Sequence, residues 1–171
     1  TGSVSWLYYS DRLMEFPLGV FGIALATVIL PQLSKQIAES AIEEYRQTID
    51  WALRLALVVV VPAAVALMAM AHPLILTLFQ YGEFTVKDSR MAARSLIAFS
   101  PGLIGFVLVK VLAPAFYARK DTRTPVRAGV IAMVVNGLCA ATLILVVPLG
   151  HVGLAAATSI SGMVNAWLLY R

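Results

Sequence analysis

The chain has few charges for its length. Of its 171 residues, 13% are charged and 60% are hydrophobic, and the mean hydropathy is +0.85. Soluble domains contain about a quarter charged residues and close to half apolar residues. The shortage of charge therefore predicts a membrane protein rather than a soluble domain with a large core.

Cysteine and histidine are also scarce. The single cysteine, Cys139, lies in an apolar run, which excludes a disulfide framework and predicts a packing thiol. His72 and His151 lie far apart, without the spacing of metal ligands. There is no Gly-x-x-x-x-Gly-Lys loop for nucleotide phosphates and no basic run interleaved with aromatic residues. We expect no enzyme, no cofactor or metal, and no nucleic-acid partner.

Long apolar runs fill most of the sequence. A bilayer core of about 30 Å requires about 20 apolar residues in a helix. We therefore predict an all-α, polytopic membrane helix bundle with about five transmembrane helices, at residues 6–33, 51–71, 95–117, 129–149 and 152–170. The segment opens without the basic region and apolar stretch of a signal peptide, and we expect it to be part of a longer membrane protein.

Polar residues mark the ends of these spans. Thr85 and Asp88 have the spacing of a capping box ahead of the third span. Thr124-Pro125 predicts an N-cap residue and a first-turn proline at the start of the fourth. The polar segment 34–50 is expected either to lie on the membrane surface or to extend the second span. A short apolar piece around residues 73–80 is expected to form a half-helix in the interface.

Two segments share a pattern of small residues. GVFGIALATVI (19–29) and GHVGLAAATSI (150–160) both fit G-x-x-G-[IL]-A-x-A-T-x-I. Chance similarity is common in such helices, so duplication stays open. The small residues predict that these helices approach a neighbour closely.

Basic residues predict an orientation. One set of loops carries seven basic residues and the other set carries three, Lys87, Arg90 and Arg94. The positive-inside rule makes the richer side cytoplasmic. We expect residue 1 on the periplasmic side and residue 171 on the cytoplasmic side of a bacterial inner membrane.

Three ionisable residues interrupt the first span. Asp11, Arg12 and Glu15 are three or four residues apart and are expected to project from one side of a helix. Each unpaired charge at the bilayer centre costs about 2.5–3.5 kcal/mol on insertion scales. The triad is therefore expected either to pair and face a wet cavity or to lie at the interface, with Trp6, Tyr8 and Tyr9 as an aromatic belt. Arginine is well suited to bind phosphate, because its planar guanidinium donates two parallel hydrogen bonds.

Lys110 is the only charge well inside the third span. Its long apolar stem allows the ammonium to reach the cytoplasmic interface, and a position facing a cavity is the alternative. We count it as a possible secondary member of the site.

Several long strings resemble one family. YYSDRLMEFP, LFQYGEFT, KVLAPAFYARKDTRTPV and GLAAATSISGMVNAWLLY resemble segments of the MurJ (MviN) family of bacterial lipid II flippases, in the MOP exporter superfamily. The resemblance covers essentially all of the chain. It implies two six-helix lobes around a central cavity, followed by two further helices. This chain would then be helices eight to twelve, an incomplete part of the second lobe.

The resemblance also implies a function. Members move lipid II, the undecaprenyl-diphosphate-linked disaccharide-pentapeptide, across the inner membrane by alternating access. The family's Asp-Arg-x-x-Glu corresponds to Asp11, Arg12 and Glu15. It implies that Arg12 contacts the diphosphate while Asp11 and Glu15 orient it or relay its charge. The expected partners are lipid II, membrane lipids and the rest of the same transporter chain, whose first lobe supplies the remaining charged residues.

Two alternatives stay open from the sequence. One is another transporter of the same superfamily, either a cation-coupled drug antiporter or an O-antigen or polysaccharide lipid flippase. In an antiporter, Asp11 and Glu15 would carry protons or sodium. The other is a membrane scaffold that transports nothing, with the triad at the surface.

Overall fold

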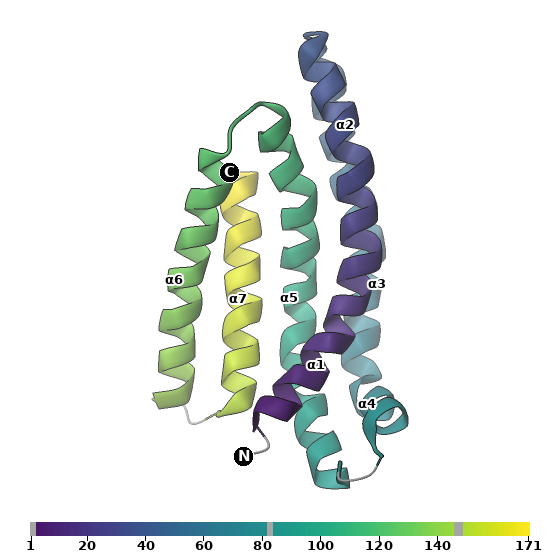
Figure 1. Cartoon of the computed structure of the whole chain (residues 1–171), viewed down its shortest axis with the longest axis vertical. Coiled ribbons are helices and arrows are strands. Elements are labelled where there is room, and N and C mark those ends of the chain that lie inside the picture. Colours follow the sequence, from purple (N-terminus) through teal and green to yellow (C-terminus); the bar gives the residue numbers. More distant parts are fainter. Residues whose placement is uncertain (1–2, 82–83, 146–148) are drawn as a thin grey trace.

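The computed structural model describes residues 3–81, 84–145 and 149–171. Over these residues the chain is all helical, which confirms the predicted fold class. The elements are α1 (Ser3–Pro17), the π-helical segment η1 (Leu18–Ile23), α2 (Ala24–Ala38), α3 (Ile42–Ala69), α4 (Ala71–Phe79), α5 (Val86–Ala118), α6 (Arg123–Leu145) and α7 (His151–Tyr170). The continuous helix α1–η1–α2, α5 and α7 run in one direction, and α3 and α6 run in the other (Figure 1).

Five helices in the described part of the chain are long and apolar enough to cross a membrane, as the sequence predicts. Several of these helices extend beyond the ends of the predicted spans. The polar segment 34–50 completes α2 and begins α3, with a turn at residues 39–41 between them. It therefore extends two spans rather than lying as a separate helix on the surface. The short apolar piece forms α4, which packs against α5.

Helix α5 is the centre of the bundle. Leu103, Val107 and Val111 on this helix are almost completely buried. They belong to one hydrophobic cluster with Ile29 of α2 and Val60 of α3. Figure 1 shows α5 between the α6–α7 pair and the helices α2 and α3. Burial on several sides, with neighbours on both flanks, explains why its apolar residues are not confined to a single stripe.

Small residues bring α5 and α7 into backbone contact. A Cβ added to Gly105 would lie 2.5 Å from the carbonyl carbon of Gly162. A Cβ added to Gly102 would lie 2.7 Å from the Cα of Ser159, whose hydroxyl donates to the Ala98 carbonyl oxygen at 2.6 Å. The predicted close approach is therefore confirmed for α7.

The other predicted close approach has a different partner. In the 19–29 segment, a Cβ added to Gly22 would lie 3.3 Å from the side-chain Cγ of Lys110. Gly22 therefore meets a flexible stem of α5 rather than a neighbouring backbone.

The capping signals have different outcomes. The capping box is confirmed, because the Asp88 backbone N–H donates to the Thr85 hydroxyl and the Asp88 carboxylate accepts from the Thr85 N–H. The prediction for Thr124 is wrong. Helix α6 begins at Arg123, and Asp121 Oδ1 accepts from the backbone N–H groups of Arg123 and Thr124 at 3.0 and 3.1 Å. An aspartate ahead of the helix thus takes the capping role, and the proline lies inside the first turn.

A bend separates α1 from α2. Pro17 ends α1, and the π-helical segment η1 follows directly. Proline lacks the N–H that would bond to the carbonyl four residues earlier, and its ring crowds that carbonyl. Wider π turns and sharp bends occur where such a bond is lost. Figure 1 shows α1 inclined to α2, so the N-terminal part of this long helix is not collinear with the rest.

The α5–α7 contact gives a stability prediction. In the full-length protein, Gly105→Ala should lower the thermal unfolding midpoint in detergent, because the added methyl meets the α7 backbone and overpacking typically costs about 1–3 kcal/mol. The matched control is Gly137→Ala in α6, where an added Cβ meets no atom within 4 Å. The midpoint of this control should hold or rise, since alanine is the better helix former by about 0.5–1 kcal/mol. Equal midpoints for the two variants would contradict the close crossing.

Candidate functional site

One face of α1 is fixed to the N-terminal end of α5. The Trp6 indole donates to Asp88 Oδ1 at 2.8 Å. One turn further, the buried Ser10 hydroxyl lies 2.7 Å from the carbonyl oxygens of both Trp6 and Ala92 and donates its proton between them. Because Asp88 also belongs to the capping box, the start of α5 and the start of α1 share one carboxylate.

Aromatic rings complete this attachment. The Trp6 ring lies edge-on to His151 at the start of α7, with centroids 4.9 Å apart. The Tyr9 ring packs against Phe79 of α4 and Phe84, at 4.7 and 5.1 Å. Trp6 and Tyr9 are therefore packing residues of the fold, and only Tyr8 of the three is exposed. Their packing fixes the rotation of α1 about its axis.

This rotation turns Arg12 and Glu15 outward. Arg12 Nη1 lies 3.0 Å from Glu15 Oε2, and both side chains are about half exposed. The guanidinium carbon also lies 5.0 Å from the centre of the Tyr8 ring, within cation–π range. The three-residue spacing brings Arg12 and Glu15 together as an ion pair, and the exposed part of the guanidinium is accessible to a ligand.

Asp11 belongs to a different part of the surface. It is half-buried and lines a hollow of about 370 Å³ between α1, α5 and α7. Phe99, Leu154 and Thr158 form the other side of this hollow. In the described residues no ion pair joins Asp11 to Arg12 or Glu15. Of the three residues expected to project from one side of the helix, Arg12 and Glu15 form a pair, and Asp11 lies toward α5 and α7.

Lys110 lies apart from this pair. Its stem packs against Gly22 in η1, and the residue is exposed. Gly22 is ten residues beyond Arg12 in the chain, which corresponds to roughly 15 Å of helix rise. The structure therefore places Lys110 beside the same long helix but further along it than Arg12 and Glu15, and does not bring the three residues together.

The arrangement is suited to binding rather than to bond chemistry. In the described part of the chain, no group of three His, Cys, Asp or Glu side chains could hold a metal ion. The exposed stripe that carries Arg12 continues with the apolar residues Phe16, Val20 and Ile23. An arginine with free donors above an apolar stripe can bind an anionic group attached to an apolar ligand.

Comparisons with known proteins agree on one family. The model of the family described as "Lipid II flippase MurJ" matches residues 1–171. The chain belongs to the MurJ family. A relative from Vibrio cholerae named "Probable lipid II flippase MurJ" is 53% identical over 171 residues, which cover 100% of this chain and 32% of the relative. A relative from Burkholderia cenocepacia named "Lipid II flippase MurJ" is 41% identical over 169 residues, 99% of this chain and 32% of the relative.

A solved structure agrees with the MurJ assignment. The structure titled "Lipid II flippase MurJ, inward closed conformation" matches with a TM-score of 0.88 and 29% identity, covering 99% of this chain and 35% of that one. The chain thus spans about a third of the length of these MurJ relatives. With its five long apolar helices it is a multi-pass membrane segment.

Sequence reasoning missed the residues that hold the site in place. Trp6, Ser10 and Asp88 determine how α1 meets α5, yet Trp6 and Asp88 are 82 residues apart in the chain. The Ser10 hydroxyl in an apolar run was a usable signal, because such a hydroxyl needs a carbonyl partner when it is buried.

The attachment of α1 gives a second prediction. Trp6→Phe keeps the aromatic ring but removes the donor to Asp88, so it should lower the thermal unfolding midpoint of the full-length protein and loosen α1. The control is Trp51→Phe, because Trp51 is 55% exposed and its loss removes little packing. Hydrogen exchange of the α1 amides should rise in Trp6→Phe only. Unchanged exchange in that variant would contradict the role of the indole.

Proposed function

We propose that this chain is part of a bacterial inner-membrane lipid II flippase. The flippase moves undecaprenyl-diphosphate-linked peptidoglycan precursor across the membrane by alternating access, and Arg12 binds the diphosphate. Membership in the MurJ family supports the substrate class. The observation that carries the role of Arg12 is its outward guanidinium, paired on one side with Glu15 and free on the other.

The depth of the site supports a cavity rather than the membrane surface. Helix α7 has 20 residues, about 30 Å, which equals the thickness of the bilayer core. Asp11 shares its hollow with Leu154 and Thr158, three and seven residues after His151. That position is roughly 5–10 Å inside the span, and Arg12 and Glu15 follow Asp11 along α1. Charges at this depth require water or a partner, which a central cavity between two lobes provides.

The pair is suited to a transient ligand. A phosphate takes bidentate hydrogen bonds from a guanidinium, and Glu15 gives Arg12 a partner when the ligand has left. Without such a partner, the empty site would leave an unpaired charge in the membrane. Asp11 orients the outer turn of this helix from its hollow, and Lys110 offers a second positive charge deeper along it.

Charge supports the orientation of the segment. Eight basic residues lie at the end of the bundle where α2, α5 and α7 finish: Lys35, Arg46, Arg54, Arg119, Lys120, Arg123, Arg127 and Arg171. We assign this end to the cytoplasm and the end with Lys87, Arg90 and Arg94 to the periplasm. Lipid II then meets the Arg12–Glu15 pair in the outer half of the bilayer. The partners are lipid II, surrounding membrane lipids and the rest of the same chain. Translocation breaks no covalent bond, so no enzymatic reaction is assigned.

Complementation of flippase loss tests the role of Arg12. In the full-length protein, Arg12→Ala should abolish growth in cells depleted of their own flippase, because the diphosphate loses its charged contact. Membrane abundance should stay near normal, since in the described part of the chain the ion pair and the cation–π contact of Arg12 are with Glu15 and Tyr8 on its own helix. Arg90→Ala is the control, an exposed arginine at the same end of the bundle. Full growth with Arg12→Ala at normal abundance would remove Arg12 from the mechanism.

A binding measurement separates the flippase from a cation-coupled antiporter. Purified full-length protein should lose most of its affinity for a lipid-linked diphosphate in Arg12→Ala, by about tenfold to a hundredfold, as expected for a charge-assisted contact worth about 1.5–3 kcal/mol. Glu15→Gln should bind the same lipid with similar or higher affinity, because Glu15 competes for the guanidinium. Binding that survives Arg12→Ala but fails with Glu15→Gln would favour the antiporter.

A further inference from the structure

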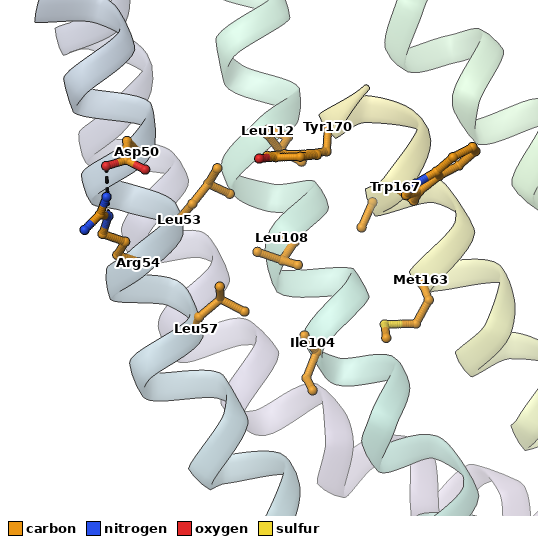
Figure 2. Close-up of a pocket in the computed structure, with 11 residues that line it drawn as sticks. Asp50, Leu53, Arg54, Leu57, Ile104, Leu108, Leu112, Met163, Trp167 and Tyr170 are labelled. Carbon is orange, nitrogen blue, oxygen red and sulfur yellow. Dashed lines mark ion pairs between the residues drawn. The ribbon is translucent and has the colours of Figure 1, made fainter.

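A second hollow lies between α3, α5 and α7, near the end where α7 finishes. It has a volume of about 420 Å³, within the range of small-molecule sites. Figure 2 shows its apolar floor, formed by Leu53, Leu57, Ile104, Leu108, Leu112 and Met163. We call this hollow the α3–α5–α7 groove. Among the residues that line it, none belongs to α1, η1 or α2, so it is separate from the Arg12–Glu15 pair.

The two sides of the groove carry polar and aromatic groups. On α3, Arg54 Nε lies 2.8 Å from Asp50 Oδ2, and both side chains are exposed. On α7, Trp167 and Tyr170 line the opposite side. The guanidinium of Arg171 lies 5.6 Å from the Trp167 ring. Figure 2 shows the Asp50–Arg54 pair across the groove from Trp167.

The charges at this mouth favour an anionic occupant. Asp50 neutralises one of the two guanidiniums, so Arg54 and Arg171 together leave a net positive charge. Arg46 lies one turn before Asp50 on the same side of α3, where the exposed Glu43 three residues earlier offsets its charge, so the mouth as a whole keeps a net positive charge. Tryptophan and tyrosine with nearby arginine are typical of the level of lipid headgroups. A long apolar floor that ends at such a level matches an acyl chain joined to a phosphate.

We propose that the α3–α5–α7 groove binds an anionic phospholipid of the surrounding leaflet. One acyl chain lies along the leucines of α3 and α5, and the phosphate bonds to Arg54 and Arg171. A zwitterionic lipid offers the same chain and phosphate, but its ammonium meets the positive mouth, so the net negative lipid binds more tightly. The bound lipid contacts three helices at once and therefore stabilises their packing. This site is independent of the proposed transport substrate.

Photo-crosslinking in nanodiscs tests the site. The full-length protein is placed in phosphatidylcholine discs that contain a small fraction of phosphatidylglycerol with a diazirine on its acyl chain. Labelled peptides should come from residues 53–57 and 163–170. The same fraction of diazirine-bearing phosphatidylcholine should label them several-fold less. Equal labelling by the two lipids would mean ordinary surrounding lipid and would overturn the proposal. Absence of labelling from both would mean that another part of the chain covers the groove, which would also overturn it.

Charge variants provide the matched comparison. Arg54→Gln and Arg171→Gln should each lower phosphatidylglycerol labelling about fivefold, the factor that corresponds to about 1 kcal/mol per basic residue near an anionic surface. Asp50→Asn should raise it, because Arg54 loses its competing carboxylate. The control is Arg127→Gln, which removes an exposed charge from α6 at the same end of the bundle and should change nothing. A loss of labelling in Arg127→Gln equal to that in Arg54→Gln would reduce the effect to general surface charge and overturn the site.

Discussion

The attachment of α1 to α5 determines the direction in which the Arg12–Glu15 pair faces. A helix with a polar turn can insert with that turn toward lipid, toward protein or toward water, and only its packed face decides among them. Here the packed face is fixed by the indole of Trp6 on Asp88 and by the Ser10 hydroxyl on the Ala92 carbonyl. Arg12 is two residues from both Ser10 and Met14, which places it on roughly the opposite side of the helix, so burying Ser10 and Met14 leaves Arg12 outside.

The bend at η1 adds a second constraint. After Pro17 and η1 the helix runs beside α5 as α2, and before Pro17 α1 takes its own inclination (Figure 1). The turn that carries Arg12 is therefore held by the contacts of α1 with the start of α5. Its position does not depend on α1 and α2 forming one straight helix. Gly22 allows α5 to approach at the bend, where the stem of Lys110 fills the space that a Cβ would occupy. Arg12 on α1 and Lys110 on α5 are thus placed by different contacts, Arg12 before the bend and Lys110 at it.

Local patterns in the sequence predicted most of the fold. Span number, the capping box at Thr85 and the close approach of the 150–160 segment to a neighbour follow from hydropathy, side-chain chemistry and residue size within a short window. The start of α6 was misplaced because Thr124-Pro125 fits a cap, while Asp121 supplies a stronger one three residues earlier. The bond from Trp6 to Asp88 joins residues 82 positions apart, so no local pattern contains it. The separation of Asp11 from the ion pair could not be predicted from a local pattern either. It depends on the position of α7, whose residues Leu154 and Thr158 line the same hollow as Asp11.

Two arginines on different faces of the bundle each form an ion pair with a carboxylate on their own helix. On α1, Arg12 pairs with Glu15 three residues away and keeps donors free toward a face that this segment leaves uncovered. On α3, Arg54 pairs with Asp50 four residues away beside an apolar groove. Both pairs reduce the cost of a charge near lipid, and both can exchange the carboxylate for a phosphate oxygen. In the proposed arrangement they differ in depth, because a bilayer phosphate can rest beside Arg54 at the end of the bundle, whereas Arg12 lies within the span. On this proposal a phosphate reaches Arg12 only when it is carried into the membrane, and that requirement links the position of Arg12 to a transported lipid rather than to a resident one.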